Sequence, residues 1–357
     1  MRDMLKKKMS KNTRSNLITY GIVIVAFIVM QTLISTGSIS SLMEGLMIPL
    51  CIYIILAVSL NLVVGILGEL SLGHAGFMCA GAFASAFFSK CMRDVITIAP
   101  LRFFLALLIG VAVAAVFGII IGIPVLRLKG DYLAIVTLAF GEIIKNLVNV
   151  LLIGKDSNGF HFSTKDVMDL NMEADGTVIV NGPQGITGTP QDSTFVIGVI
   201  LILITLFIVI NMVNSRDGRA IMAIRDNRIA AESVGINVTK YKLMAFTVSA
   251  ALAGAAGVLY AHNLSTLTAN TNNFGYNMSI NILVFVVLGG IGSIRGSMIA
   301  AVVLTLLPEL LRGLSDYRML IYAIVLIIMM LFNWSPKAIE WREKYLSFGK
   351  KKKEAVK

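Results

Sequence analysis

Charged residues are scarce in this chain of 357 residues. They make up 14% of the sequence, whereas hydrophobic residues make up 57% and the mean hydropathy is +0.83. A soluble globular chain has roughly a quarter of its residues charged. Apolar runs of about 20 residues, long enough to cross a hydrocarbon core of roughly 30 Å, recur along the sequence. The shortage of charge excludes a soluble protein and indicates an integral membrane protein.

Residue patterns that carry common enzyme chemistry are also missing. The three cysteines and three histidines are scattered, so they predict neither a disulfide framework nor a metal site. The chain has no H-E-x-x-H or G-x-S-x-G motif. Its glycine-rich stretch GGIGSIRG, at 289–296, lacks the lysine of a P-loop and the glycine spacing of a Rossmann fingerprint. The sequence therefore predicts no catalytic residue, no metal and no cofactor bound by this chain.

Ten apolar segments of near-spanning length predict an all-α, polytopic helix bundle. The third and eighth segments are the shortest and richest in small residues, so tilted, broken and re-entrant helices are alternatives for them. The predicted spans are 17–36, 43–64, 73–89, 101–123, 132–153, 194–213, 242–262, 277–290, 297–312 and 318–334.

Basic residues set the predicted orientation. With the N-terminus inside, the inner segments hold 23 Lys and Arg and the outer segments hold seven. Cytoplasmic flanks carry the excess of basic residues, so both termini are predicted to be cytoplasmic. The basic N-terminus (1–16) and C-terminal tail (335–357) then flank a transmembrane domain at 17–334. Their charge favours contact with anionic membrane lipid, not with nucleic acid.

Two polar loops interrupt the apolar sequence. The outer loop at 154–193 is acidic and rich in Gly and Pro, which predicts turns and a short hairpin. The cytoplasmic loop at 214–241 is basic. We expect Asp217 to cap a first short helix, Asn227 to cap a second, and Gly235 to end the second, because these residue types favour those positions.

A few polar residues lie within apolar segments. Glu142 and Lys145 are three apart in one predicted span, so they share a helix face and are expected to pair, and Asn146 extends the polar stripe. Glu69 and His74 belong to GELSLGHAGF, a glycine-rich interruption. Charges inside a membrane usually face a partner or a cavity, so these five residues are candidates for a pathway. A structural ion pair and a simple inner turn are the alternatives.

Several stretches resemble a known family. IAAESVG, at 229–235, is similar to the E-A-A-x-x-x-G motif of ABC importer permeases, with Ala230, Ala231 and Gly235 in register and Ile229 in place of the glutamate. From about residue 45 onward, the chain resembles the branched-chain amino acid permeases, in particular the LivM-type subunit. The resemblance is carried by GELSLGHAGFMCAGAFASA (68–86), RLKGDYLAIVTLAFGEIIK (127–145), RDNRIAAESVGINVTKYKLMAFTVSAALAGAAGVLYA (225–261) and VLGGIGSIRGSMIAA (287–301).

The resemblance implies a multi-pass subunit of a bacterial inner-membrane importer. Its implied partners are a second permease of the LivH type, two cytoplasmic ATPase subunits that use ATP, and an extracytoplasmic binding protein. The loop at 214–241 would couple the chain to the ATPases, whereas a plain basic connecting loop is the alternative. Lys242 is expected to lie beyond this contact as a surface residue. The implied coupling residues are Arg225, Asp226, Asn227, Ala230, Ala231 and Gly235.

Branched-chain amino acids are the substrates that the resemblance implies. Urea or short amides are alternative substrates, because related permeases serve them. An ion-coupled secondary transporter is the alternative from another class, with Glu142, Lys145 or His74 as its proton relay.

Overall fold

The computed structural model describes residues 11–37, 40–128, 130–156, 158–173 and 176–311, together with isolated residues between 317 and 331. The predicted basic tail at 335–357 and the first ten residues of the predicted segment 1–16 lie outside the described residues. So does most of the tenth predicted span.

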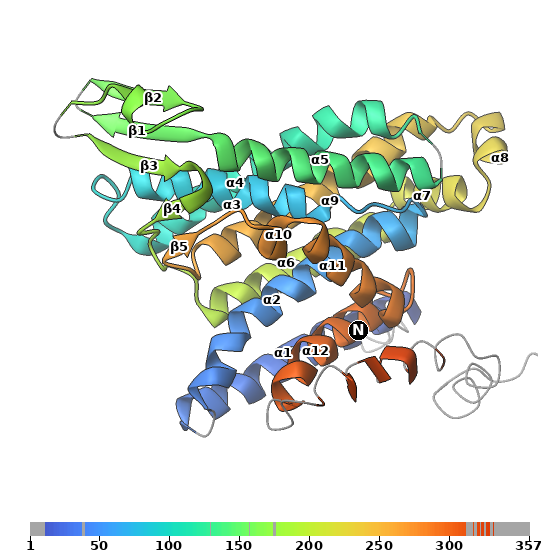
Figure 1. Cartoon of the computed structure of the whole chain (residues 1–357). Coiled ribbons are helices and arrows are strands. Elements are labelled where there is room, and N and C mark those ends of the chain that lie inside the picture. Colours follow the sequence, from blue (N-terminus) through green and yellow to red (C-terminus); the bar gives the residue numbers. More distant parts are fainter. Residues whose placement is uncertain are drawn as a thin grey trace, which may run out of the picture.

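Helices form most of the described chain (Figure 1). Six of them are long and apolar enough to cross a membrane. These are α1 (Lys11–Ser35), α2 (Ser41–Asn61) continued by the π-helix η2 (Leu62–Leu67), α4 (Ala99–Val125), α5 (Asp131–Val150), α6 (Phe195–Asn214) and α9 (Val238–Ala261). The shorter helices are α3 (His74–Cys91), α7 (Arg216–Asp226), α8 (Arg228–Ser233), α10 (Thr271–Phe274), α11 (Tyr276–Gly289) and α12 (Ile294–Leu310).

The predicted polytopic helix bundle is therefore confirmed, and its number of spans stays a prediction. Helices α3, α11 and α12, of 18, 14 and 17 residues, occupy three further predicted spans and are not among these six helices. The predicted span 132–153 is too long at its end. Helix α5 stops at Val150, and the residues from Leu152 onward belong to a strand.

Small residues let three helices approach closely at the centre of the bundle, where α9 packs against α3 and α4. A Cβ atom added to Gly81 of α3 would lie 2.6 Å from the Cα of Gly254 in α9. One added to Gly254 would lie 2.4 Å from the Cβ of Ala114 in α4. Without a hydrophobic drive between helices in lipid, such close backbone packing holds a membrane bundle together.

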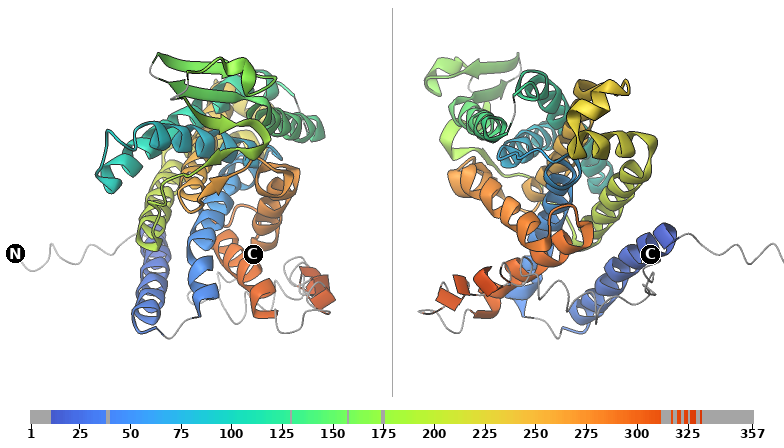
Figure 2. Two further views of the ribbon diagram at one scale, coloured as in Figure 1. Left: turned by 60° about the vertical axis from the view of Figure 1, so that its left-hand side comes forward. Right: turned by 90° about the vertical axis from the view of Figure 1, so that its right-hand side faces the viewer.

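Helix α1 lies at the edge of the bundle (Figure 2). Only 11% of the residues in its most apolar stretch are buried. It contacts α6, where the Phe27 and Phe195 rings lie 5.6 Å apart. Exposed aliphatic side chains such as Val25 and Ile28 cover its outer side. An exposed apolar helix surface of this kind suits contact with lipid.

Two small antiparallel sheets correct the expectation of an all-α fold. Strands β1 (Leu152–Asp156), β2 (Gly159–Ser163) and β3 (Thr177–Asn181) form one sheet in the order β2-β1-β3, and β4 (Ile186–Thr187) pairs with β5 (Thr266–Leu267). Two short 3₁₀ helices, η3 (Met168–Leu170) and η4 (Gly182–Gln184), lie between β2 and β3 and between β3 and β4 along the chain. The predicted hairpin in the outer loop is confirmed by the pairing of β1 with β2.

The sheets and the helices α7 and α8 lie at opposite ends of the bundle (Figure 1). Lys90, near the end of α3, anchors the larger sheet by donating hydrogen bonds to the carbonyl oxygens of Val178 and Ile179 at 3.1 and 3.3 Å. We call these two ends the sheet end and the α7–α8 end. They correspond to the predicted outside and cytoplasmic sides.

Candidate functional site

Side-chain caps shape the two short helices at the α7–α8 end. Ser215 caps α7 by accepting a backbone N–H of its first turn at 3.1 Å, so the predicted cap Asp217 is wrong and lies inside the helix. Asn227 caps α8, as predicted, by accepting the N–H of Ala230 at 3.0 Å. Each cap satisfies an N–H that a first helical turn leaves without a partner.

Gly235 ends α8 in the predicted left-handed conformation, with φ of 85°. The next residue, Ile236, donates its N–H to the carbonyl of Ala231 at 3.0 Å, and Gly235 donates to that of Glu232 at 3.0 Å. Glycine takes this conformation at low cost because it has no Cβ. The chain can therefore turn sharply from α8 into α9.

Helix α8 has one buried and one exposed side. Ala231 is 3% exposed and packs in a small cluster with Ile224 of α7 and Val238 of α9. Ile229 and Val234 are 79% and 75% exposed. The small side chain of Ala231 lets α8 lie against its neighbours, while the two larger apolar side chains are offered outward.

Arg225 and Lys242 both reach the segment in which η2 ends. The Nη1 atom of Arg225 donates to the carbonyl oxygen of Gly65 at 3.0 Å, and its Nε and Nη2 atoms donate to Asp226 at 3.1 and 3.0 Å. Lys242 forms an ion pair with Glu69, with side chains 5% and 15% exposed. The expectation that Lys242 is a surface residue is wrong, because α9 turns it toward the connection between η2 and α3.

The predicted pairing of Glu142 and Lys145 is confirmed. Lys145 Nζ lies 2.5 Å from Glu142 Oε2 and also donates to Thr271 Oγ1 at 3.2 Å. Glu142 Oε1 accepts the backbone N–H of Tyr276 at 2.8 Å. One helical turn further, Asn149 donates to the carbonyl oxygen of Ala269 at 2.8 Å. The polar side of α5 thus holds the segment that contains α10 and the start of α11.

Exposed amides continue this polar side onto α10 and α11. Asn272 and Asn277 are exposed and joined by a hydrogen bond of 3.3 Å, and Asn281 is exposed one turn beyond Asn277. Asn146 is exposed on α5, one turn beyond Glu142. We call Asn146, Asn272, Asn277 and Asn281 the amide face.

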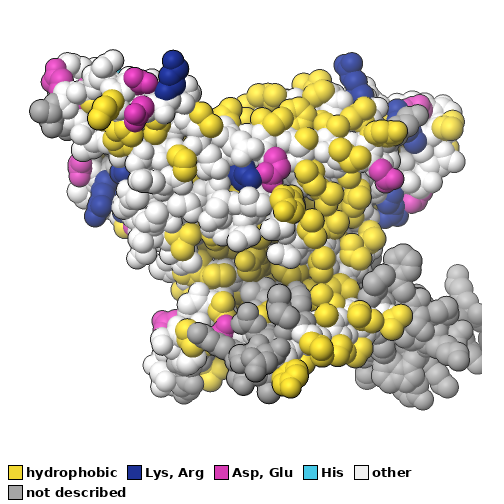
Figure 3. Space-filling model, viewed as in Figure 1, with side chains coloured by type: hydrophobic (Ala, Val, Ile, Leu, Met, Phe, Trp, Pro, Cys, Tyr) yellow, Lys and Arg dark blue, Asp and Glu magenta, His cyan; other side chains and the backbone are white. Residues whose placement is uncertain are grey.

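Helices α5, α10 and α11, which carry the amide face, lie toward the viewer in Figure 1, and Figure 3 draws the same side of the molecule. Hydrophobic side chains gather there toward the α7–α8 end, whereas the surface over β5 and α10 is largely polar or backbone. Polar groups facing hydrocarbon cost free energy unless they are hydrogen-bonded. Exposed amides beside a spanning helix therefore indicate a surface that meets water or another protein.

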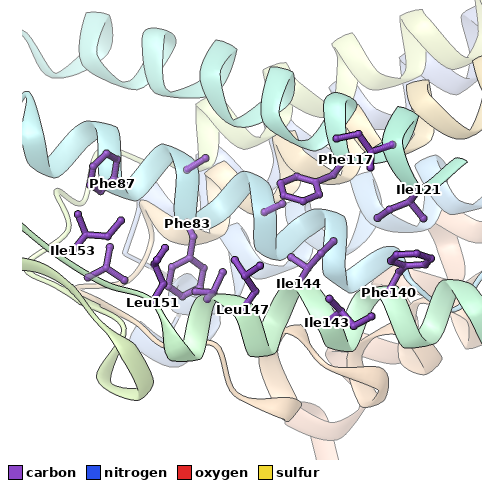
Figure 4. A pocket seen from close by; sticks show the side chains of 15 residues that line it. Phe83, Phe87, Phe117, Ile121, Phe140, Ile143, Ile144, Leu147, Leu151 and Ile153 are labelled. Atoms are coloured by element: carbon purple, nitrogen blue, oxygen red, sulfur yellow. The ribbon is translucent and has the colours of Figure 1, made fainter. Parts of the chain in front are cut away.

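The opposite side of α5 is apolar. It borders a crevice of about 340 Å³ between α3, α4 and α5, lined by side chains such as Phe83, Phe117, Phe140 and Leu147 (Figure 4). Strand β1 contributes Ile153 at its sheet end. A zwitterionic or strongly polar ligand would lose its hydration there without gaining hydrogen bonds. The crevice is therefore not a candidate site for such a ligand.

His74 lies in the core at the start of α3, where it is 2% exposed. Its Nε2 atom lies 2.7 Å from Ser59 Oγ, and Ser249 of α9 donates to the Ser59 carbonyl oxygen at 2.6 Å. The structure thus separates the five pathway candidates. Glu142, Lys145 and Asn146 lie together on α5, whereas His74 is buried near α2 and Glu69 pairs with Lys242. Their roles in a pathway stay predictions.

Sequence reasoning missed most of the amide face. Asn272, Asn277 and Asn281 fall in the segment ANTNNFGYNMSIN at 269–281, of which only 277–281 belongs to a predicted span. Its signal is the density of asparagine at the start of a predicted span. Asparagine carries both a donor and an acceptor and is costly to place against lipid.

The chain is similar to known permeases. Residues 42–332 match the family described as branched-chain amino acid transport system / permease component. The high-affinity branched-chain amino acid transport system permease proteins LivM of Salmonella typhimurium and Escherichia coli are 35% and 36% identical to it. Each alignment covers 81% of this chain and 67% of the relative. The ribose import permease protein RbsC of Escherichia coli is 28% identical over 78% of this chain and 81% of its own. No solved structure matches the chain.

Six helices long and apolar enough to cross a membrane, with a polar surface along α5, define a multi-pass membrane protein. The chain belongs to the branched-chain amino acid transport system permease family, because the family match covers most of its length. It is therefore a transporter subunit of the bacterial inner membrane and not an enzyme. As an ABC permease, it works in a complex with other components of its transporter.

Proposed function

We propose that this chain is the permease subunit of an ATP-binding-cassette importer that carries branched-chain amino acids. The amide face, together with the Glu142–Lys145 pair, is the observation that carries the proposal. It places exposed polar groups along α5, α10 and α11, beside helices that are otherwise apolar. The LivM relatives, named for branched-chain amino acid transport, support the substrate.

The chemistry of the amide face suits a passing amino acid. An amino acid carries an ammonium and a carboxylate, which need acceptors and donors respectively. Asparagine amides supply both kinds of group without net charge. A pathway must bind its solute well enough to admit it and weakly enough to release it. Neutral amides meet this demand better than fixed charges, and Glu142 and Lys145 neutralise one another.

A second permease subunit of the LivH type completes the pathway in this proposal. The amide face is open on one side, so a pathway along it needs a second wall that excludes lipid. Substrate arrives from an extracytoplasmic binding protein at the sheet end. The chain itself binds no cofactor, and ATP is used by the partner ATPases.

Helix α8 supplies the contact to one of the two ATPase subunits. Two exposed apolar side chains, Ile229 in α8 and Val234 directly after it, lie on a polar loop, as expected of a short helix that enters a groove on a partner. Asp226, Asn227 and Ala230 are their neighbours in the sequence, whereas Arg225 acts from within by binding the carbonyl oxygen of Gly65. Ala231 and Gly235 act from within, by seating α8 on the bundle and by turning the chain away.

The test is uptake by the complete transporter in proteoliposomes. The chain is co-purified with the second permease, the two ATPases and the binding protein of the proposed complex. Labelled leucine should accumulate only with ATP and the binding protein present, and unlabelled isoleucine or valine should compete. Uptake of urea in place of leucine would overturn the substrate. Uptake driven by a pH gradient without ATPases would overturn the class.

A further inference from the structure

The π-helix η2 and the residues directly after it are contacted by one residue that precedes α8 in the sequence and by one that follows it. On the N-terminal side, Arg225 of α7 donates to the carbonyl oxygen of Gly65 at 3.0 Å. Its side chain also packs on Gly68, where an added Cβ would lie 2.5 Å from Arg225 Cγ. On the C-terminal side, Lys242 of α9 pairs with Glu69. One attachment from α7 and one from α9 therefore converge on the five residues from Gly65 to Glu69.

The convergence point is the end of the π-helix η2. The carbonyl groups of a last helical turn lack partners within the helix, and Arg225 takes one of them. Gly68 then leaves the helix in the left-handed conformation, with φ of 81°. π-Helical turns are rare, and many lie at functional sites.

The start of η2 is joined to another helix. Asn61, directly before η2, donates to Ser297 Oγ of α12 at 2.8 Å and accepts the N–H of Gly292 at 2.9 Å. Gly65 lies so close to Gly292 that an added Cβ would come within 2.3 Å of its backbone nitrogen. A displacement of η2 would thus act on α12 as well as on α3.

We propose that Arg225 and Lys242 are positioning residues that transmit movement of α8 to η2. This inference rests on the proposed function, in which α8 docks on an ATPase. Without these attachments, a movement of α8 would be absorbed by the short segment 234–237 that links it to α9. With both, α8 cannot move without displacing Gly65 and Glu69. Helix η2 and the connection 68–73 are then the element that changes position during transport.

The ion pair and the Arg225 hydrogen bond differ in how they respond to substitution. The Glu69–Lys242 pair is nearly buried, so removing one charge leaves the other unpaired in a poorly solvated place. Arg225 contacts a backbone carbonyl, which no substitution at position 65 can remove, and a side chain added there would collide with Gly292. Only Arg225 and the ion pair can therefore be tested by substitution without altering η2 itself.

The test uses the reconstituted complex and separates docking from coupling. The variants are Arg225→Gln, Lys242→Gln, Glu69→Gln and the charge exchange Glu69→Lys with Lys242→Glu. Matched controls are Arg216→Gln and Lys240→Gln, which change exposed residues of the same type in α7 and α9. ATPase co-purification reports docking, and the ratio of substrate-stimulated to basal ATP hydrolysis reports coupling.

Arg225→Gln and Lys242→Gln are expected to retain the ATPases while the stimulation ratio falls at least about fivefold, the lower end of typical coupling between sites. The charge exchange should recover part of the loss, and both controls should match wild type. If Lys242→Gln is not monodisperse, Lys242→Arg takes its place, with an intermediate ratio expected because the charge remains but its reach changes.

Wild-type ratios in Arg225→Gln and Lys242→Gln would overturn the inference. So would a loss of stimulation that only follows a loss of bound ATPase, since the residues would then serve docking. A charge exchange no better than the single variants would contradict a role for the ion pair. A wild-type complex that binding protein and substrate fail to stimulate would instead refute the proposed function.

Discussion

The Lys145 ammonium lies 2.5 Å from the Glu142 carboxylate on the polar side of α5. The same carboxylate accepts the N–H of Tyr276, and the same ammonium donates to Thr271. The pair therefore does more than neutralise itself, because it fixes α10 and α11 against a spanning helix. The contribution of the pair to stability can be measured by removing one charge at a time.

Glu142→Gln and Lys145→Met should each destabilise the protein more than the double variant does. A single change leaves one charge unpaired, and losses of 3–5 kcal/mol are typical of fully buried pairs, so we expect about 2 kcal/mol here because the Glu142 side chain is 24% exposed. Thermal loss of monodispersity in detergent measures the effect. Lys155→Met, at an exposed position in β1, is the control. Additive losses in the double variant would dismiss the coupling.

Val234→Asp should weaken binding of the ATPase subunit about tenfold or more, because it places a charge in the apolar contact proposed for α8. Pull-down of ATPase by the solubilised chain measures it. Val95→Asp is the matched control, since Val95 is also 75% exposed but lies in a turn at the opposite, sheet end. Equal recovery of ATPase from both variants would show that α8 does not carry the contact.

Gly235→Val should impair ATPase binding, whereas Gly235→Asn should largely preserve it. Nothing lies within 4 Å of a Cβ added at this position, so the cost comes from the backbone, where φ is 85°. The left-handed conformation costs most residues roughly 1–2 kcal/mol, and less for asparagine. ATPase titration of the two solubilised variants compares them. Equal affinities would mean that the left-handed turn is unimportant for docking.

The outer hairpin should open in acid. Burial of the Asp156 carboxylate works against its ionisation, but N–H groups of Glu173 and Asn158 and the His161 ring stabilise the charge and lower the pKa of Asp156. A lowered folded-state pKa stabilises the fold above the unfolded value of about 3.9, and this stability is lost as pH falls through the folded pKa.

Limited pepsin digestion between pH 5 and pH 2 tests this expectation. Cleavage between β1 and β3 should begin below about pH 4 in the wild-type chain. Asp156→Asn should be cleaved across the whole range, because its neutral amide accepts the same N–H groups more weakly. A wild-type hairpin that resists pepsin as well at pH 2 as at pH 5 would show that this carboxylate does not hold it.

Local patterns predicted those features of the loop at 214–241 that depend on neighbouring residues. Asn227 and Gly235 were placed correctly at the two ends of α8, since a cap and a left-handed turn are decided within a few residues. The cap predicted for α7 was Asp217, whereas the structure uses Ser215. Serine and aspartate are both residue types that favour the N-cap position. The choice between two capping residues two positions apart depends on where α6 stops, which its apolar pattern leaves open by a few residues.

The pairing within α5 was predictable for the same reason. Glu142 and Lys145 are three apart, so one helix brings them together whatever surrounds it. Their further contacts to Thr271 and Tyr276 were not predictable, because more than 120 residues separate these partners in the chain. Only packing of α10 and α11 against α5 decides them.

The sequence by itself determined that this chain is a membrane permease, since apolar run length, scarcity of charge and family motifs are properties of the chain alone. Tertiary structure alone decided which side of each helix is covered. It turned Lys242 inward to Glu69, buried Ala231 of α8 against α7 and α9, and left the amide face exposed. A helical pattern predicts which residues share one face of a helix. What covers that face comes from helices distant in the chain, and their approach depends on close packing throughout the bundle.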